Sequence, residues 1–362
     1  MIKYNGQSDR VEEEYWMINF GKINKQIGFL FVAVLLLVVL IPSIRAIDYS
    51  EPIPLPQLGS DTYLGMQGGL YSNGANNPPT SYVIDQIQPA YNILENDTHI
   101  VVLCLGMSNL THTCDALINK MAIDMSINSA VKMVNGGQPG RAQQAWDGDI
   151  STTDGVWANA NKRLTQAGET PETVDIIIYF NAWAYPNEPD FEAYVQTMHD
   201  SLTITMDNIS TLYANTQLIY IDSREYAGYT VTDLNPDPWA YWDGFAFKRL
   251  VEDRINNVQS EPPLLWAAYQ YDPTWPNSYF KENDGTHLSD AGLDAASQLW
   301  LNFFKTEPWF GSDTDPIGTS TPPSTTPTSP PTSTMTPFPT PTSTRNPIID
   351  EYNFLPFVIR AP

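Results

Sequence analysis

Cysteine and histidine are scarce in the 362-residue sequence, which contains two cysteines and four histidines. So few cysteines exclude a disulfide framework and a cysteine-rich zinc site. The sequence also lacks a phosphate-binding glycine loop and a dinucleotide-binding fingerprint. Basic residues are few as well, because 18 lysines and arginines stand against 41 acidic residues and give a formal charge of −23. A field of that sign repels phosphate backbones, so nucleic acid is not an expected partner.

Long apolar stretches are equally rare, and the main one covers residues 27–41 and ends at Pro42. Its length exceeds that of most signal-peptide cores but falls short of a comfortable membrane span. We therefore expect residues 27–46 to be a signal peptide or a membrane anchor. Lys22 and Lys25 precede the run, so residues 1–26 are predicted to be a cytoplasmic leader. Either alternative predicts an extracytoplasmic protein, secreted or anchored to the outer face of the cytoplasmic membrane.

Composition divides the remainder of the chain into four parts. Residues 47–95 are rich in Pro, Gly and Asn, and we expect them to be ordered against the main domain, along the rim of a site. Residues 96–311 form the predicted main domain. Residues 312–345 are almost wholly Thr, Pro and Ser, which indicates an extended linker. Residues 346–362 form an apolar tail, either an inert end or a sorting or docking peptide.

From His99 onwards, apolar strand-like segments alternate with helical ones. The predicted strands are residues 100–105, 131–134, 174–180, 217–221 and 264–268. The predicted helices are residues 115–127, 156–166, 191–213, 245–258 and 290–304. This alternation predicts an α/β fold with a five-stranded parallel sheet covered on both faces by helices.

Ser108 lies just beyond the first of these strands, whose apolar run is broken at Gly106. Open α/β sheets place their ligands at the carboxyl ends of their strands. Ser108 is therefore a candidate nucleophile, and an ordinary turn after a buried strand is the alternative.

The segment Asn-Asp-Gly-Thr-His, ending at His287, precedes the last predicted helix. An imidazole activates a serine by accepting its proton, and a carboxylate orients the imidazole. Asp284 and His287 could supply both groups, and His112 is the rival base because it is close to Ser108 in sequence. Ser289 and Asp290 are expected to cap the following helix.

Two further segments follow strands and could hold an oxyanion. The glycine-rich turn Asn-Gly-Gly-Gln-Pro-Gly ends at Gly140, where a backbone N–H could approach a ligand. Asn181 follows the third strand, and its side-chain amide could donate a second hydrogen bond.

With these blocks in this order, the chain resembles the SGNH hydrolases, also called the GDSL esterase and lipase superfamily. Gly106-Met107-Ser108-Asn109 is similar to the first block, although Met107 stands where aspartate is usual. Gly140 matches the oxyanion glycine, and Asp284 to His287 matches the final block. The third block departs from the pattern, because Tyr179-Phe180-Asn181-Ala182 lacks its glycine and its aspartate. Residues 68–71 and 226–229 are similar to those of an exported bacterial branch.

The resemblance implies a three-layer, flavodoxin-like αβα sandwich and ester hydrolysis without a cofactor or a metal. We expect an exported, monomeric serine esterase with Ser108 as nucleophile, His287 as base and Asp284 as its orienting carboxylate. The substrate is expected to be a small-molecule or glycan ester carrying an acyl or acetyl group. The tryptophans near the predicted site loops offer stacking surfaces for a glycan; they are Trp146, Trp157, Trp183 and Trp242. A non-catalytic surface-binding module on the same fold is the alternative, motivated by the altered third block.

Cys104 lies on the strand that leads to Ser108, and Cys114 follows Ser108 by six residues. If a helix begins near Cys114 and descends beside the strand, the two sulfurs reach similar depths. An exported protein would allow them to form a disulfide, and two separate thiols are the alternative.

Overall fold

The computed structural model describes residues 52–257 and 261–311. The predicted leader, apolar segment, linker and apolar tail lie outside these residues, as do residues 47–51 of the predicted extension. Within the described ranges, no helix combines the length and the apolar character needed to cross a membrane.

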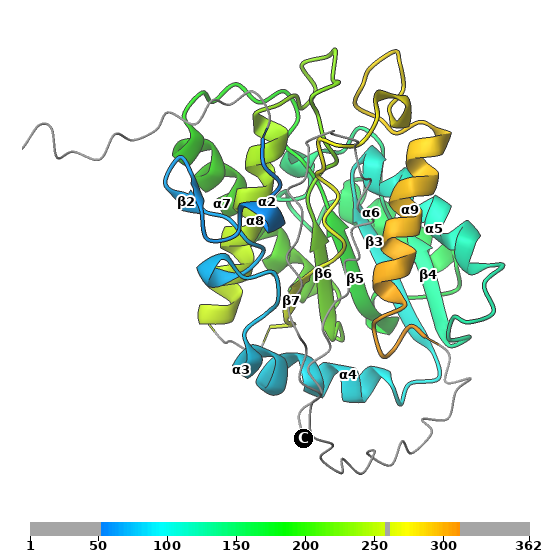
Figure 1. Cartoon of the computed structure of the whole chain (residues 1–362). Coiled ribbons are helices and arrows are strands. Elements are labelled where there is room, and N and C mark those ends of the chain that lie inside the picture. The colour runs from blue at the N-terminus through cyan, green and yellow to red at the C-terminus, as the bar shows by residue number, and fades with distance from the viewer. Residues whose placement is uncertain (1–51, 258–260, 312–362) are drawn as a thin grey trace, which may run out of the picture. The chain divides into compact units, whose positions relative to one another are not determined.

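Five parallel strands form the central sheet in the order β4-β3-β5-β6-β7 (Figure 1). Their bounds are β3 Ile100–Gly106, β4 Val131–Asn135, β5 Val174–Phe180, β6 Leu218–Asp222 and β7 Leu264–Trp266. This arrangement confirms the predicted α/β class and its five-stranded parallel sheet. The interior strand β3 is buried along its whole length, as the apolar run of Ile100–Leu105 predicts.

Helices cover both faces of the sheet and complete three layers. The first face packs against α6 (Val156–Gln166), α7 (Phe191–Leu212) and α8 (Trp239–Asn256). The second face packs against α4 (Gln88–Leu94), α5 (Ser108–Met121) and α9 (Asp290–Phe304).

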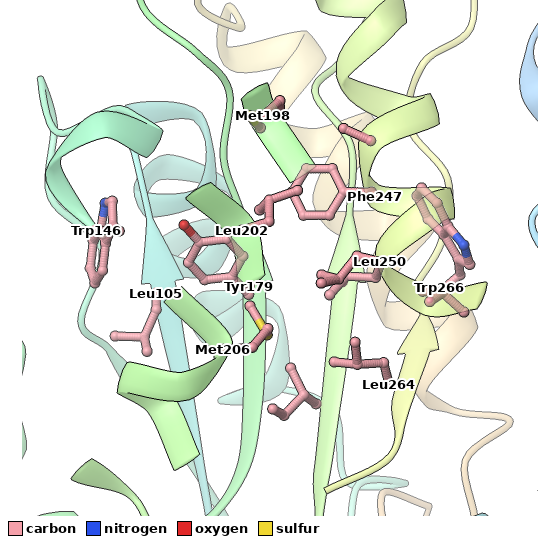
Figure 2. Packing of buried hydrophobic residues seen from close by; sticks show 14 of the residues in the cluster. Leu105, Trp146, Tyr179, Met198, Leu202, Met206, Phe247, Leu250, Leu264 and Trp266 are labelled. Atoms are coloured by element: carbon pink, nitrogen blue, oxygen red, sulfur yellow. The ribbon is translucent and has the colours of Figure 1, made fainter. Parts of the chain in front are cut away.

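The two cores follow from side-chain alternation along the strands. On β3, Leu103 and Leu105 point into the first core, whereas Val102 and Cys104 point into the second. Figure 2 shows Leu105 in the first core together with aromatic and aliphatic side chains from the helices and neighbouring strands. Burying an aliphatic or aromatic side chain completely stabilises the folded state by about 1.5–3 kcal/mol. Both cores therefore stabilise the sheet that carries the site.

Two helices begin earlier than the sequence pattern predicts. Helix α5 begins at Ser108 and ends at Met121, so the prediction of residues 115–127 was wrong at both ends. Its first turn contains polar residues that are buried by tertiary contacts, so no apolar periodicity marks it. Helix α8 begins at Trp239 rather than residue 245, and its first turn contains the buried rings of Tyr241 and Trp242.

Residues 52–95 form short elements where the sequence indicated only turns. They are α2 (Leu55–Leu58), the hairpin of β1 (Thr62–Tyr63) and β2 (Met66–Gln67), α3 (Thr80–Tyr82), a π-helical turn (Val83–Ile87) and α4. The hydroxyl groups of Tyr71 and Tyr82 accept hydrogen bonds from the backbone of β7, at Trp266 (3.2 Å) and Leu264 (2.8 Å). The segment therefore provides hydrogen-bond acceptors for N–H groups of the edge strand β7, which would otherwise be unpaired.

Candidate active site

The candidate nucleophile lies at the junction of β3 and α5. Gly106 ends the strand, and Ser108 is the first residue of the helix. A Cβ atom at Gly106 would lie 1.9 Å from the carbonyl oxygen of Phe180 on β5, so only glycine fits at this close approach. Ser108 is 8% exposed and therefore largely buried at this junction.

The structure brings Ser108, His287 and Asp284 together. Ser108 Oγ lies 2.8 Å from His287 Nε2, and His287 Nδ1 lies 2.8 Å from Asp284 Oδ2. Burial opposes ionisation of Asp284, but hydrogen bonds from the backbone and ring of His287 outweigh it and lower the pKa of this carboxyl. The ionised carboxylate can only accept, so Nδ1 carries the ring proton and Nε2 remains free to accept the proton of Ser108.

The loop that carries His287 is fixed from several sides. Asp284 Oδ1 accepts the backbone N–H groups of Thr286 (2.8 Å) and His287 (2.9 Å). Gly285 has φ +61°, and a Cβ atom there would lie 1.8 Å from the carbonyl oxygen of Tyr229. Ser289 caps α9, because its side chain accepts the N–H of Gly292. Asp290 begins that helix instead of capping it.

His112, the rival candidate for the base, lies beside the ring of His287. The ring centroid of His112 lies 6.0 Å from that of His287. Burial lowers the pKa of His112, and the nearby Lys281 and His287 lower it further. The ring that bonds Ser108 is that of His287.

Gly140 lies on an exposed turn after β4. The turn runs beside the nucleophile, since the N–H of Gln138 donates to the carbonyl of Gly106 over 2.8 Å. Gly137 packs tightly on α5, where a Cβ atom would lie 2.6 Å from Thr111 Oγ1. The second block therefore reaches the same edge of the sheet as Ser108.

Asn181 follows β5 and is fully buried. Its Nδ2 donates to the hydroxyl of Tyr179 over 3.0 Å, and its Oδ1 accepts the N–H of Ala182 over 3.1 Å. Tyr179 in turn donates to Gln143 Oε1 over 2.6 Å. At least one N–H of the amide is thus engaged inside the protein rather than directed at a substrate.

The start of α5 adds a feature that the sequence prediction missed. The first N–H groups of any α-helix have no acceptor within the helix, and the helix dipole is positive at that end. Since α5 begins at Ser108 itself, these groups lie beside the nucleophile. The sequence offers only a weak signal for this start, the break at Gly106 followed by the polar residues Ser108 and Asn109.

A buried polar cluster also lies against the site and was not predicted. Asn109 Nδ2 donates to Glu225 Oε2 over 2.7 Å, and Arg224 is adjacent in sequence. Burial raises the pKa of Glu225, opposed by the charge of Arg224 and the hydrogen bond from Asn109. Burial lowers the pKa of Arg224, opposed by the nearby carboxylates of Glu225, Asp237 and Asp243.

The expectation that four tryptophans offer stacking surfaces was wrong for three of them. Trp146, Trp157 and Trp242 are at most 5% exposed and belong to the first core. The rings of Trp146 and Trp157 meet edge to face with centroids 5.1 Å apart. Only Trp183 is half-buried, so only this ring retains an exposed surface.

Cys104 and Cys114 form a disulfide, so the alternative of two separate thiols was wrong. Their Cα atoms lie 6.6 Å apart, within the range that a disulfide spans. The bond ties β3 to α5 directly below Ser108. In the part of the chain that the structure describes, no group of three or more His, Cys, Asp or Glu side chains is placed to hold a metal ion.

Fold and site together define a class of protein. The chain is a three-layer α/β protein with a Ser-His-Asp arrangement at the carboxyl edge of its parallel sheet. The order of its blocks along β3, β4, β5 and the loop before α9 is the one that the resemblance to SGNH hydrolases implies.

No family model matches the sequence, and no curated protein matches it. Among solved structures, the chain is similar to the lipase Lip_vut3 from a goat rumen metagenome, at 14% identity and a TM-score of 0.35, over 56% of this chain and 96% of that one. It is also similar to a Clostridium thermocellum family 3 carbohydrate esterase, at 12% identity and a TM-score of 0.37, over 58% and 97%. A Bacillus subtilis protein is similar at 11% identity and a TM-score of 0.36, over 58% of this chain and 57% of that one. The chain thus spans little more than half the length of the Bacillus protein. Similarity at this level does not show an activity.

Proposed function

We propose that the protein is a serine esterase that hydrolyses acyl or acetyl esters. The observation that carries the proposal is the hydrogen-bonded series from Ser108 Oγ through His287 to Asp284, with both distances at 2.8 Å. The side chains of His287 and Asp284 are 23% and 19% exposed, so the series is open to a substrate at the surface.

In the proposed reaction, Ser108 Oγ attacks the ester carbonyl carbon while His287 Nε2 accepts the serine proton. His287 then gives this proton to the leaving alcohol, and the acyl group stays on Ser108. Water attacks the acyl carbon, His287 accepts its proton, and the carboxylic acid leaves as the proton returns to Ser108. Asp284 keeps the imidazole in the required tautomer and stabilises its protonated form.

The oxyanion would be held by the backbone N–H groups of Ser108 and Gly140. The position of Ser108 at the N-terminus of α5 supports its N–H as an oxyanion donor, because the helix dipole favours negative charge there. Asn181 is the third candidate donor, and its contact with Tyr179 supports a weaker role.

The proposal also covers the location of the protein and the class of its substrate. The disulfide between Cys104 and Cys114 supports export, because disulfides persist in oxidising compartments. A membrane or cell-envelope attachment through residues 27–46 and a monomeric state are part of the same proposal. Half-buried Tyr229 and Trp275, close to the His287 loop, support a sugar-bearing ester as substrate.

Hydrolysis of short p-nitrophenyl esters tests the proposal. The wild-type protein should turn over, and Ser108→Ala should lower kcat by about 10³-fold or more while the fold is kept. A fluorophosphonate probe should label the wild type and leave Ser108→Ala unlabelled. Turnover that survives Ser108→Ala would refute the assignment.

The non-catalytic binding module remains the second candidate, supported by the engaged amide of Asn181. It predicts a folded wild-type protein with neither turnover nor labelling.

A further inference from the structure

Three buried polar side chains connect the two segments that carry the candidate catalytic groups. Asn109 follows Ser108 on α5, and Arg224 and Glu225 lie just beyond β6. Asn109 is 2% exposed, and Arg224 and Glu225 are fully buried. Buried charges are costly unless they are paired and hydrogen-bonded, so their contacts indicate what the cluster stabilises.

The contacts of two of these side chains converge on one backbone carbonyl. The oxygen of Thr286 accepts from Asn109 Nδ2 over 3.1 Å and from Arg224 Nη2 over 3.3 Å. Thr286 directly precedes His287, and its own N–H donates to Asp284. The carbonyl is therefore held from both the nucleophile helix and the segment after β6.

Asn109 and Arg224 also make hydrogen bonds to groups other than the Thr286 carbonyl, and these bonds fix the two side chains. Asn109 Nδ2 also donates to Glu225 Oε2 over 2.7 Å. Arg224 Nη1 donates to Asn235 Oδ1 over 3.0 Å and to the Asn235 carbonyl. The planar guanidinium can bond Asn235 and Thr286 together, which a lysine ammonium on a flexible stem cannot match.

We propose that Asn109 and Arg224 are positioning residues that hold His287 against Ser108 through the carbonyl of Thr286, with Glu225 fixing Asn109. This inference rests on the proposed function. The bond from Asn109 to Thr286 runs between the same two segments as the bond from Ser108 to His287, one residue further along the nucleophile helix. A misplacement of about 1 Å in such a pair can cost about 10²-fold in rate.

The kinetic test uses Asn109→Ala, Arg224→Lys and their double mutant. Each single variant should lower kcat by about 10- to 100-fold with KM within about twofold, because the substrate surface is left intact. Both side chains act on one carbonyl, so the double mutant should lose clearly less than the product of the single losses. Wild-type kcat in the folded single variants, or independent losses in the double mutant, would overturn the proposal.

A matched pair of glutamates separates positioning from general destabilisation. Glu225→Ala releases Asn109 and should lower kcat about tenfold or more, whereas Glu225→Gln keeps an acceptor oxygen and should stay within about threefold of wild type. Glu307 is also buried and accepts from the hydroxyl groups of Tyr91 and Tyr220, away from this cluster. Glu307→Ala should lower the unfolding temperature and leave kcat within about twofold. An equal loss of kcat in Glu225→Ala and Glu307→Ala would contradict positioning.

A readout that needs no turnover distinguishes this inference from the proposed function. The proton on His287 Nδ1 should give a downfield NMR signal in the wild type, and it should broaden or vanish in Arg224→Lys. A signal unchanged in Arg224→Lys refutes positioning. Absence of ester hydrolysis by the wild type refutes the proposed function instead. Should Asn109→Ala fail to fold, Asn109→Ser replaces it in the kinetic and NMR comparisons under the same criteria.

Discussion

Replacing Asn181 by alanine should cost the protein more in stability than in rate. Loss of a working oxyanion donor typically lowers kcat by about 10²–10³-fold. The amide of Asn181 already donates to Tyr179, and the side chain is fully buried. We therefore expect Asn181→Ala to lower kcat by less than about tenfold.

The expected loss of stability follows from the contacts of the side chain. Asn181→Ala removes its hydrogen bonds to the Tyr179 hydroxyl and to the N–H of Ala182. Each such bond contributes about 0.5–1.5 kcal/mol net, and a buried partner left unsatisfied adds about 1–3 kcal/mol. The free energy of unfolding should fall by about 2–4 kcal/mol, which is the larger effect of the substitution.

Tyr179→Phe is the matched control, because it removes the same hydrogen bond and leaves the amide in place. Steady-state kinetics with p-nitrophenyl acetate and urea unfolding should be measured on both variants. We expect Tyr179→Phe to keep kcat within about threefold of wild type. A loss of 10²-fold or more in Asn181→Ala, beside an active Tyr179→Phe, would show that Asn181 is a full oxyanion donor and refute this reasoning.

Three further predictions concern the rival base His112, the carboxyl of Asp175 at the start of β5, and the disulfide. His112→Phe should keep kcat within about threefold, because the ring that bonds Ser108 is that of His287; a loss like that of Ser108→Ala would make His112 the base. Burial raises the pKa of Asp175 to about 6, so the folded protein holds this proton more tightly than the unfolded chain does. The contribution of Asp175 to the free energy of unfolding is therefore present at low pH and is lost as the pH rises from about 4 to 6. Asp175→Asn can still accept the N–H of Val101, and it should raise the free energy of unfolding by about 1 kcal/mol at pH 8 after allowance for solvent screening, with no change near pH 4 in a urea titration. Thiol labelling of denatured, unreduced protein from an oxidising compartment should find no free thiol, and replacing both Cys104 and Cys114 by alanine should lower the free energy of unfolding by about 2–3 kcal/mol.

The sequence predicted the sheet well because most of its strands are buried on both faces. A strand with both faces covered is a continuous apolar run, and β3 and β5 show this most clearly. Ser108 and His287 could be singled out for a related reason: the serine follows such a run, and only four histidines compete for the role of base.

The start of α5 could not be predicted in the same way. Its first turn is stabilised by contacts with residues far away in the sequence, such as the bond from Asn109 to Glu225 across 116 positions. Polar residues that are buried against distant partners carry no periodic signal. The burial of three tryptophans was missed for the same reason, because proximity to a loop in sequence does not determine which way a ring points.

The position of Asn109 links these observations. Asparagine is a poor residue for the interior of a helix, because its side chain competes for backbone hydrogen bonds. Here it lies in the first turn of α5, where its Nδ2 donates to the Thr286 carbonyl and to the Glu225 carboxylate. The bond between Ser108 and His287 is one contact between the nucleophile helix and the His287 loop. The bond from Asn109 to Thr286 is a second contact between the neighbouring residues, so an asparagine at this position is explained by the orientation that it gives to the imidazole.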